Sequence, residues 1–243
     1  MKDLTGYKLV FSDDFDRDTM GDDWMPRWNG GSNGCYSSAE QVSFRDSCLH
    51  ITGQYKTEGE FGPGWYGGSL VLRKLYTKGY FECRCKPGHA PKNKGLWTAY
   101  WIQPDHPYEP EISKGGLGGA EMDVFECYTG DDGVEFFEST IHCAGKQQRI
   151  RPSKPLDSLI FLRCVPDNLC SEFHTFGFDW DDDQYTVYMD GVKLSSTSWG
   201  DGTSNAPGDV AFSVCVRERA KLIEDPNFTI DIAVDWMKIW QKE

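Results

Sequence analysis

Three acidic residues stand among apolar neighbours near the middle of this 243-residue chain, in the run Glu121-Met122-Asp123-Val124-Phe125-Glu126. A buried carboxylate without partners is costly or stays protonated, so acids on a short apolar segment indicate pKa values adjusted for chemistry. Carboxyl groups about 5 to 5.5 Å apart suit retaining glycoside hydrolysis, and a wider pair suits inversion. The plainer alternative is a cluster of acids at a strand end or a calcium site.

The spacing of the three acids does not fit a regular strand if all three are to lie on one face. Side chains alternate between faces, so Glu121 and Asp123 share a face whereas Glu126, five positions from Glu121, would point to the other. One extra residue bulged out between Asp123 and Glu126 returns all three acids to a single face. We therefore predict a β-bulge at Val124 or Phe125.

A preceding segment, residues 95–101, presents Trp97, Ala99 and Trp101 on one face of a predicted strand. Flat aromatic rings are surfaces on which the apolar C–H face of a sugar stacks. Burial of both tryptophans in the core is the alternative. The sequence thus predicts an aromatic surface next to the acids.

At this point the chain resembles glycoside hydrolase family 16, whose members carry an E-x-D-x-x-E strand after a G-L-W-P-A-F-W-like strand. The similarity runs nearly from end to end. Its further segments are 11–15 with Trp24, 79–86, 173–180, 188–191 and 234–240. The chain departs from the family at residues 115–120, which lack a Trp-Pro pair, and at 212–219, where relatives read N-x-A-x-G-G.

The resemblance implies that Glu121 is the nucleophile, Asp123 the residue that orients and tunes it, and Glu126 the acid/base. The chemistry requires two different pKa values, because the nucleophile must be ionised while the acid holds its proton. Negative charge on Glu121 and Asp123 disfavours a further charge on Glu126, so we expect Glu126 to stay protonated near neutral pH.

Other features predict a single all-β domain over residues 1–243. An Asp190-Gly191 turn between two strand-like runs indicates a hairpin, and alternating apolar residues at 228–236 indicate a long strand with one buried face. The sequence alone supports a sandwich or a barrel. The resemblance implies a concanavalin-like β-jelly roll of two curved antiparallel sheets.

Net charge and cysteine content indicate which classes of partner the protein binds and whether it holds disulfide bonds. The formal net charge of -13 argues against nucleic acid and anionic membranes and favours a neutral polysaccharide. The nine cysteines fit neither a zinc site nor a complete disulfide framework; Cys83 and Cys85 are predicted core residues, and Cys164 with Cys170 is one candidate bridge. Residues 1–14 show no signal peptide, and we nevertheless expect an extracellular, monomeric protein.

The histidines show no metal-ligand spacing, so we expect no required cofactor. His142 matches a T-x-H strand of the family, which implies contact with sugar hydroxyls at the cleaved bond; a structural role is the alternative. Asp235 and Asp14 resemble the position where relatives hold a structural calcium ion. Arg73 is a further candidate for the cleft.

We therefore expect a retaining, endo-acting hydrolase of β-1,3- or mixed β-1,3/1,4-glucan, with Trp28, Trp97 and Trp101 as sugar platforms. The same chemistry on a β-galactan, such as agarose or a lactosamine chain of mucin type, is the first alternative. A carbohydrate-binding jelly roll without catalysis is the second. Transglycosylation is the third, because another sugar can intercept a covalent intermediate in place of water.

Overall fold

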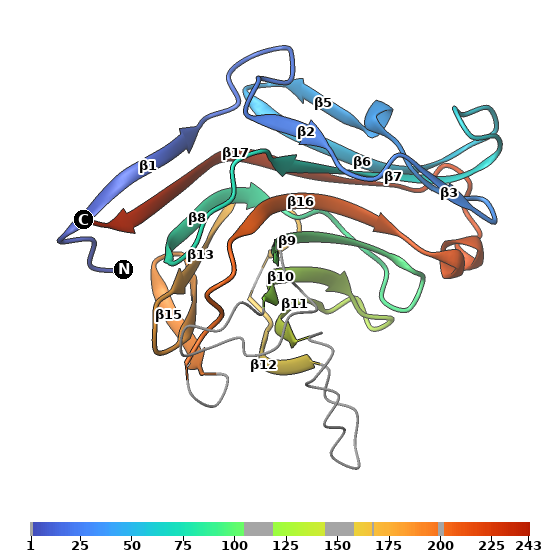
Figure 1. Cartoon of the computed structure of the whole chain (residues 1–243). Coiled ribbons are helices and arrows are strands. Elements are labelled where there is room, and N and C mark those ends of the chain that lie inside the picture. The colour runs from blue at the N-terminus through green and yellow to red at the C-terminus, as the bar shows by residue number, and fades with distance from the viewer. Residues whose placement is uncertain (1, 105–118, 144–157, 167, 199–201) are drawn as a thin grey trace.

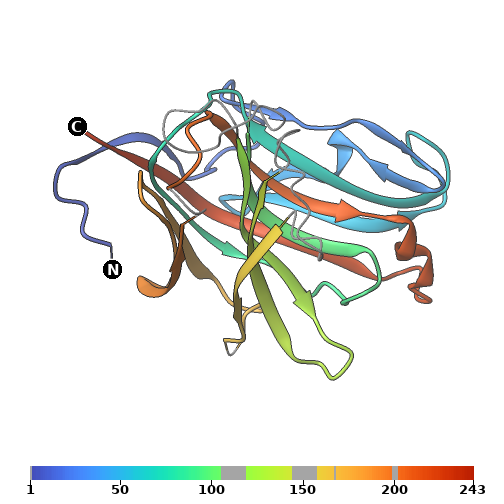
Figure 2. The same cartoon turned by 60° about the horizontal axis from the view of Figure 1, so that its bottom comes forward.

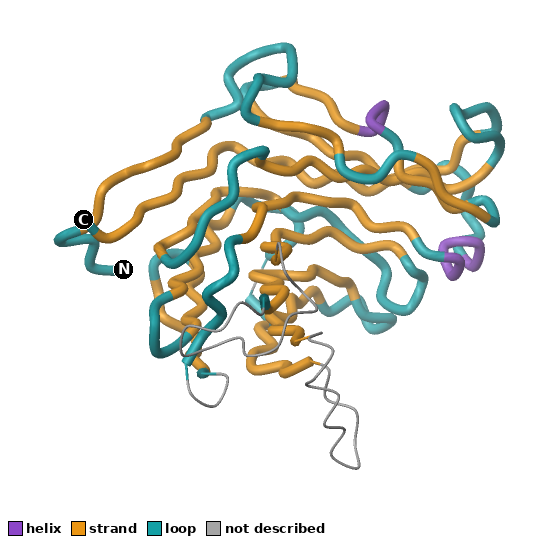
Figure 3. Tube along the Cα trace, viewed as in Figure 1, coloured by secondary structure: helices purple, strands orange, loops and turns teal. Residues whose placement is uncertain are grey.

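The chain forms two curved β-sheets packed face to face, seen as stacked layers in the computed structural model (Figure 1). The structure describes residues 2–104, 119–143, 158–166, 168–198 and 202–243. Apart from two 3-10 turns, η1 (Ala39–Gln41) and η2 (Glu218–Leu222), the regular elements described are strands (Figure 3). The predicted all-β jelly roll is confirmed. Neither turn has the length or apolar character needed to cross a bilayer.

The first sheet is antiparallel and is organised around the last strand of the chain, β17, which pairs with β6, β8 and β1. Its members in order are β5 (Val42–Arg45), β6 (Cys48–Lys56), β17 (Thr229–Lys242), β8 (Gly79–Lys86), β13 (His174–Trp180), β14 (Tyr185–Met189) and β15 (Val192–Thr197), with β1 (Tyr7–Asp13) continuing along β17 beyond β6. The strand predicted at 228–236 is therefore real and longer than predicted.

The second sheet carries the candidate site. Its order is β2 (Trp24–Pro26), β7 (Gly64–Leu72), β16 (Gly208–Val216), β9 (Leu96–Pro104), β10 (Ala120–Thr129), β11 (Glu135–Cys143) and β12 (Ser158–Cys164). In Figure 2 the hairpin of β10 and β11 is the long yellow-green element. Two short strands, β3 (Gly30–Ser32) and β4 (Cys35–Ser37), belong to the first sheet, where β4 runs parallel to the beginning of β7.

Strand β7 belongs to both sheets. Its beginning pairs with β6, whereas its later residues pair with β16. Gly67 lies at this crossing, and a side chain there would start 2.2 Å from the carbonyl oxygen of Val214. A residue without a Cβ atom is therefore required for β7 and β16 to approach this closely.

The predicted hairpin turn is also present, between β14 and β15. Asp190 and Gly191 have φ angles of 48° and 73°. Positive φ at both central residues is the requirement of a two-residue turn that matches the twist of the flanking strands. The Asp-Gly pair therefore sets this connection.

The core lies between the two sheets and is built from alternate side chains of both. Strand β10 buries Met122, Val124, Phe125 and Cys127 there, which leaves its acidic residues for the opposite face. The cysteines described in the structure are all free thiols, and Cys83 and Cys85 are buried in the core as predicted. No bridge joins Cys164 to Cys170.

Candidate active site

The predicted β-bulge is present in β10. Opposite β9 the register shifts between Asp123 and Phe125, and opposite β11 it shifts between Asp123 and Glu126. Val124 and Phe125 are both buried in the core. Two consecutive residues on the core side bring Glu126 back to the face of Glu121 and Asp123, so the parity argument from the sequence is confirmed.

The three acids line one cleft on the exposed face of the second sheet. The residues around it come from the loop after β2, from strands β9, β10 and β16, and from the position just after β16: Trp28, Trp97, Ala99, Trp101, Gln103, Glu121, Asp123, Glu126, Cys215 and Arg217. The predicted tryptophans Trp97, Trp101 and Trp28 are therefore in the same cleft as the acids. Trp101 is 6% exposed and Trp28 is 53% exposed, so the first is a wall and the second is open to solvent.

His142 lies beside the acids on the neighbouring strand, where it is paired in register with Glu121. Its Nε2 atom is 2.9 Å from Oδ2 of Asp123, whose carboxylate is otherwise nearly inaccessible. Donor atoms of Glu121, Asp123 and His142 all lie within 4.8 Å of one another. The histidine thus orients Asp123. The His142 side chain is 35% exposed, so it is accessible for the predicted contact with a sugar hydroxyl.

Burial and mutual repulsion control the titration of the acids. Burial first, and the charge of Asp123 second, raise the pKa of Glu126 to about 7, with Glu138 and Glu121 adding smaller effects. Burial and Asp123 also raise the pKa of Glu121, but His142, a hydrogen bond to Gln103 and Arg27 oppose that rise. The expected direction for Glu126 is confirmed, with burial rather than Glu121 as the main cause.

Asp123 and His142 also shift the pKa values of each other. Burial raises the pKa of Asp123, and the hydrogen bond and charge of His142 counteract it. Burial lowers the pKa of His142, but its contacts with Asp123 and the charges of the glutamates outweigh this and raise it overall. An imidazolium at this position favours the ionised form of Glu121.

An arginine connects two of the tryptophans. The rings of Trp28 and Trp101 stack with centroids 5.7 Å apart, and the guanidinium of Arg27 lies 4.8 Å and 5.0 Å from the two ring centroids. Arg27 also pairs with Asp209 at 2.6 Å. Trp28 has a φ of 52°, a strained value for a non-glycine residue, which these contacts maintain.

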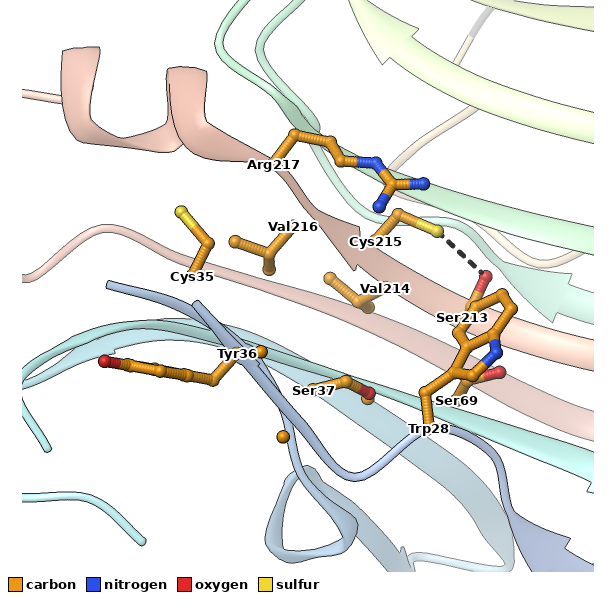
Figure 4. Close-up of a pocket in the computed structure, with 13 residues that line it drawn as sticks. Trp28, Cys35, Tyr36, Ser37, Ser69, Ser213, Val214, Cys215, Val216 and Arg217 are labelled. Atoms are coloured by element: carbon orange, nitrogen blue, oxygen red, sulfur yellow. Dashed lines mark hydrogen bonds between the residues drawn. The ribbon is translucent and has the colours of Figure 1, made fainter. Parts of the chain in front are cut away.

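A second hollow lies over β4, β7 and β16, and Figure 4 shows the residues that line it, Trp28 among them. Trp28, Cys215 and Arg217 line both hollows. Ser213 forms the floor, accepting a hydrogen bond from Nε1 of Trp101 at 3.2 Å and lying 3.4 Å from the Cys215 sulfur. The guanidinium of Arg217 lies 5.9 Å from the ring of Trp97. The shared residues show that the two hollows adjoin each other.

Arg73 is not among the residues that line this cleft. It is exposed just after β7, where Nε donates to the carbonyl oxygen of Trp24 and Nη1 approaches the sulfur of Met25 at 3.5 Å. The structure gives no support for placing it in the sugar-binding surface.

The two carboxylates suggested for calcium, Asp235 and Asp14, are not brought together as a ligand cluster in the described part of the chain. Asp235 forms an ion pair with Arg84, and Asp14 accepts a hydrogen bond from the backbone of Asp16 at 3.4 Å. Backbone oxygens also bind calcium, so the ion stays a prediction. The departure from the family at residues 115–120 falls mostly outside the described residues.

Arg27, Gln103, Ser213 and Arg217 belong to the site but were not predicted for it. Gln103 follows Trp101 by two positions and so shares its face, a signal that the sequence did contain. Arg27 has no comparable signal, because its position beside the stacked rings of Trp28 and Trp101 depends on how the loop after β2 lies relative to β9.

The sequence and the fold were compared with those of known proteins. Residues 30–237 match the sequence model of glycosyl hydrolases family 16. The chain belongs to glycoside hydrolase family 16. Among curated relatives, a glucan endo-1,3-beta-glucosidase of Cryptopygus antarcticus is 25% identical over 223 residues, covering 82% of this chain and 74% of that protein.

A xylanase/beta-glucanase of Ruminococcus flavefaciens is 24% identical over 219 residues, or 86% of this chain. The match spans only 22% of that much longer protein. Among solved structures, the family 16 enzyme SCLam, a non-specific endo-beta-1,3(4)-glucanase, has a TM-score of 0.74 at 21% identity and covers 100% of this chain and 94% of its own. A structure from work on endo-acting O-glycanases of the human gut microbiota that initiate mucin breakdown also has a TM-score of 0.74, at 17% identity, covering 98% and 92%.

Proposed function

We propose that this family 16 protein is a retaining, endo-acting hydrolase of a neutral β-1,3- or mixed β-1,3/1,4-glucan, acting outside the cell. The observation that carries the proposal is the placement of Glu121, Asp123 and Glu126 on one face of an aromatic cleft, with the pKa of Glu126 raised to about 7. A carboxylic acid with that pKa holds a proton for the leaving oxygen and takes one up afterwards.

In the proposed reaction, the Glu121 carboxylate attacks the anomeric carbon while Glu126 gives its proton to the glycosidic oxygen. The bond to the leaving sugar breaks and a glycosyl ester of Glu121 forms. Glu126, now ionised, then removes a proton from water, which attacks the same carbon and releases Glu121. Two inversions give a product with the original anomeric configuration.

Asp123 and His142 act as positioning residues in this scheme. Asp123 raises the pKa of both glutamates through its charge, and His142 lowers both, so the pair adjusts the pKa values of the nucleophile and of the acid/base. Stacking on Trp28, Trp97 and Trp101 would hold the chain across the strands, and the second hollow supports binding in the interior of a polymer.

The experiment compares wild type, Glu121→Gln and Glu126→Gln on laminarin and lichenan, with reducing sugars as the readout. Each variant is expected to lose turnover by at least about a thousandfold, because groups that act as a unit are not replaceable singly. Glu40→Gln, an exposed glutamate paired with Lys56 at 2.9 Å, is the matched control and keeps full activity. Wild-type rates in either Glu121→Gln or Glu126→Gln would refute the mechanism. Nuclear magnetic resonance of the first product tests whether the anomeric configuration is retained.

A β-galactan or a mucin-type lactosamine chain is the second candidate substrate. Its support is the O-glycanase structure, which matches this fold with the same TM-score as the glucanase. A panel of laminarin, lichenan, agarose and mucin O-glycans, with products resolved by mass, separates the two. Tight binding without turnover on every member would instead favour a carbohydrate-binding protein.

A further inference from the structure

A second group of potential ligands lies outside the cleft, where three segments distant in sequence meet. His89 lies in the connection between β8 and β9, Glu135 begins β11, and Cys170 lies in the turn before β13. One donor atom from each residue lies within 4.8 Å of the other two. Imidazole nitrogen, carboxylate oxygen and thiol sulfur are together the donors that zinc and related transition metals bind.

Hydrogen bonds already hold the three donors toward one another. Nδ1 of His89 is 2.9 Å from Oε1 of Glu135, while the backbone N–H of Cys170 donates to Oε2 of the same carboxylate at 2.8 Å. Cys170 is 2% exposed, Glu135 is mostly covered, and the His89 side chain is 57% exposed. The cluster thus has a fixed inner side and one open side, where water could complete a four-coordinate site.

Backbone hydrogen bonds hold the segments around the three ligands together. The N–H of Gly88 donates to the carbonyl oxygen of Cys170 at 3.2 Å. The N–H of Thr129 donates to the carbonyl oxygen of Ala90 at 2.5 Å. The Thr129 hydroxyl is buried, lies beside the Cys170 thiol and forms no other hydrogen bond among the described residues. A hydroxyl in that place suits a thiolate, to which it can donate.

A cysteine binds metal as the thiolate, so a protonated thiol must lose its proton when an ion binds. A divalent cation would replace that proton, which leaves to solvent as the metal–sulfur bond forms. Calcium and magnesium prefer oxygen ligands and would not compensate for this loss, whereas a thiophilic ion would.

We propose that His89, Glu135 and Cys170 bind a zinc-like divalent transition metal ion. The ion would tie the β8–β9 connection and the turn before β13 to the β10–β11 hairpin, which carries the catalytic acids on β10. The role is structural, and it is independent of the reaction proposed for the cleft.

The test uses the full chain, stripped of metal with a chelator and titrated with Co²⁺ as a spectroscopic probe. Wild type is expected to bind one ion with a thiolate-to-cobalt charge-transfer band and the visible bands of four-coordinate cobalt. Cys170→Ser should abolish the charge-transfer band, and His89→Gln should weaken binding at least about tenfold, since even partners of metal ligands contribute that much. Cys164→Ser, a half-buried cysteine outside the cluster, is the matched control and keeps the band.

The cleft contains a competing cluster of Glu121, Asp123 and His142, but it has no sulfur and cannot produce the thiolate band. His142→Gln should therefore leave the band unchanged. Zinc should also raise the thermal midpoint of wild type and not that of Cys170→Ser or His89→Gln. Absence of a thiolate band in wild type, or its persistence in Cys170→Ser, would overturn the proposal. Because His89 is exposed, His89→Gln still decides the matter if Cys170→Ser does not fold.

Discussion

Replacing His142 by glutamine tests the electrostatics of the cleft directly. Glutamine can still donate to Asp123 but carries no charge, so the imidazolium that lowers the pKa of both Glu121 and Glu126 is lost. Both pKa values should rise. The acid limb of kcat/KM, set by ionisation of Glu121, and the basic limb, set by loss of the proton on Glu126, should therefore both move to higher pH.

The size of the shift follows from the geometry. Two unit charges 4.8 Å apart, the upper limit for the Glu121 and His142 donor atoms, interact by about 3.5 kcal/mol at an effective dielectric constant of about 20 and by about 0.9 kcal/mol in bulk water. The His142 side chain is 35% exposed, so solvent screens part of this interaction. We expect about 1.4 kcal/mol, which is one pH unit on the acid limb.

The assay measures initial rates on a soluble glucan across pH for wild type and His142→Gln. His174→Gln is the matched control, because that histidine also pairs with an aspartate, Asp190, at 2.8 Å but lies on β13 in the other sheet. The control profile should superimpose on wild type. Limbs of His142→Gln that stay in place, or that move to lower pH, would refute the electrostatic reasoning.

Three further outcomes are expected. Trp28→Ala should weaken oligosaccharide binding in calorimetry by about threefold to tenfold, the worth of one aromatic contact, with an unchanged thermal midpoint because the ring is 53% exposed; unaltered affinity would exclude Trp28 as a platform. Arg217→Gln should raise KM and leave kcat close to wild type, since Arg217 lies where the two hollows join rather than at the acids; a loss confined to kcat would contradict this position. Phe125→Ala should lower the free energy of unfolding in urea by about 3–5 kcal/mol, because the ring is fully buried against Tyr100 and Phe176. A change below about 1 kcal/mol would contradict the tight packing of this ring.

Much of the site could be read from local spacing along β10. The positions of Glu121, Asp123 and Glu126 require a bulge if they are to act together, and strand parity alone gives that result. The face shared by Trp97, Ala99 and Trp101 follows from the same rule, as does the turn at Asp190 and Gly191. These features depend on residues within a few positions of one another, and the backbone geometry fixes them.

The contacts that only the tertiary structure decided join distant parts of the chain. Arg27 lies against Trp101 because the loop after β2 crosses the sheet, and His142 reaches Asp123 because β10 and β11 pair in one particular register. His89, Glu135 and Cys170 meet only where three connections converge. Register and sheet packing come from the sum of many weak apolar contacts, which no single sequence segment contains. The amino-acid pattern therefore determined which side chains share a strand face, and the packing of the sheets determined which of those faces meet.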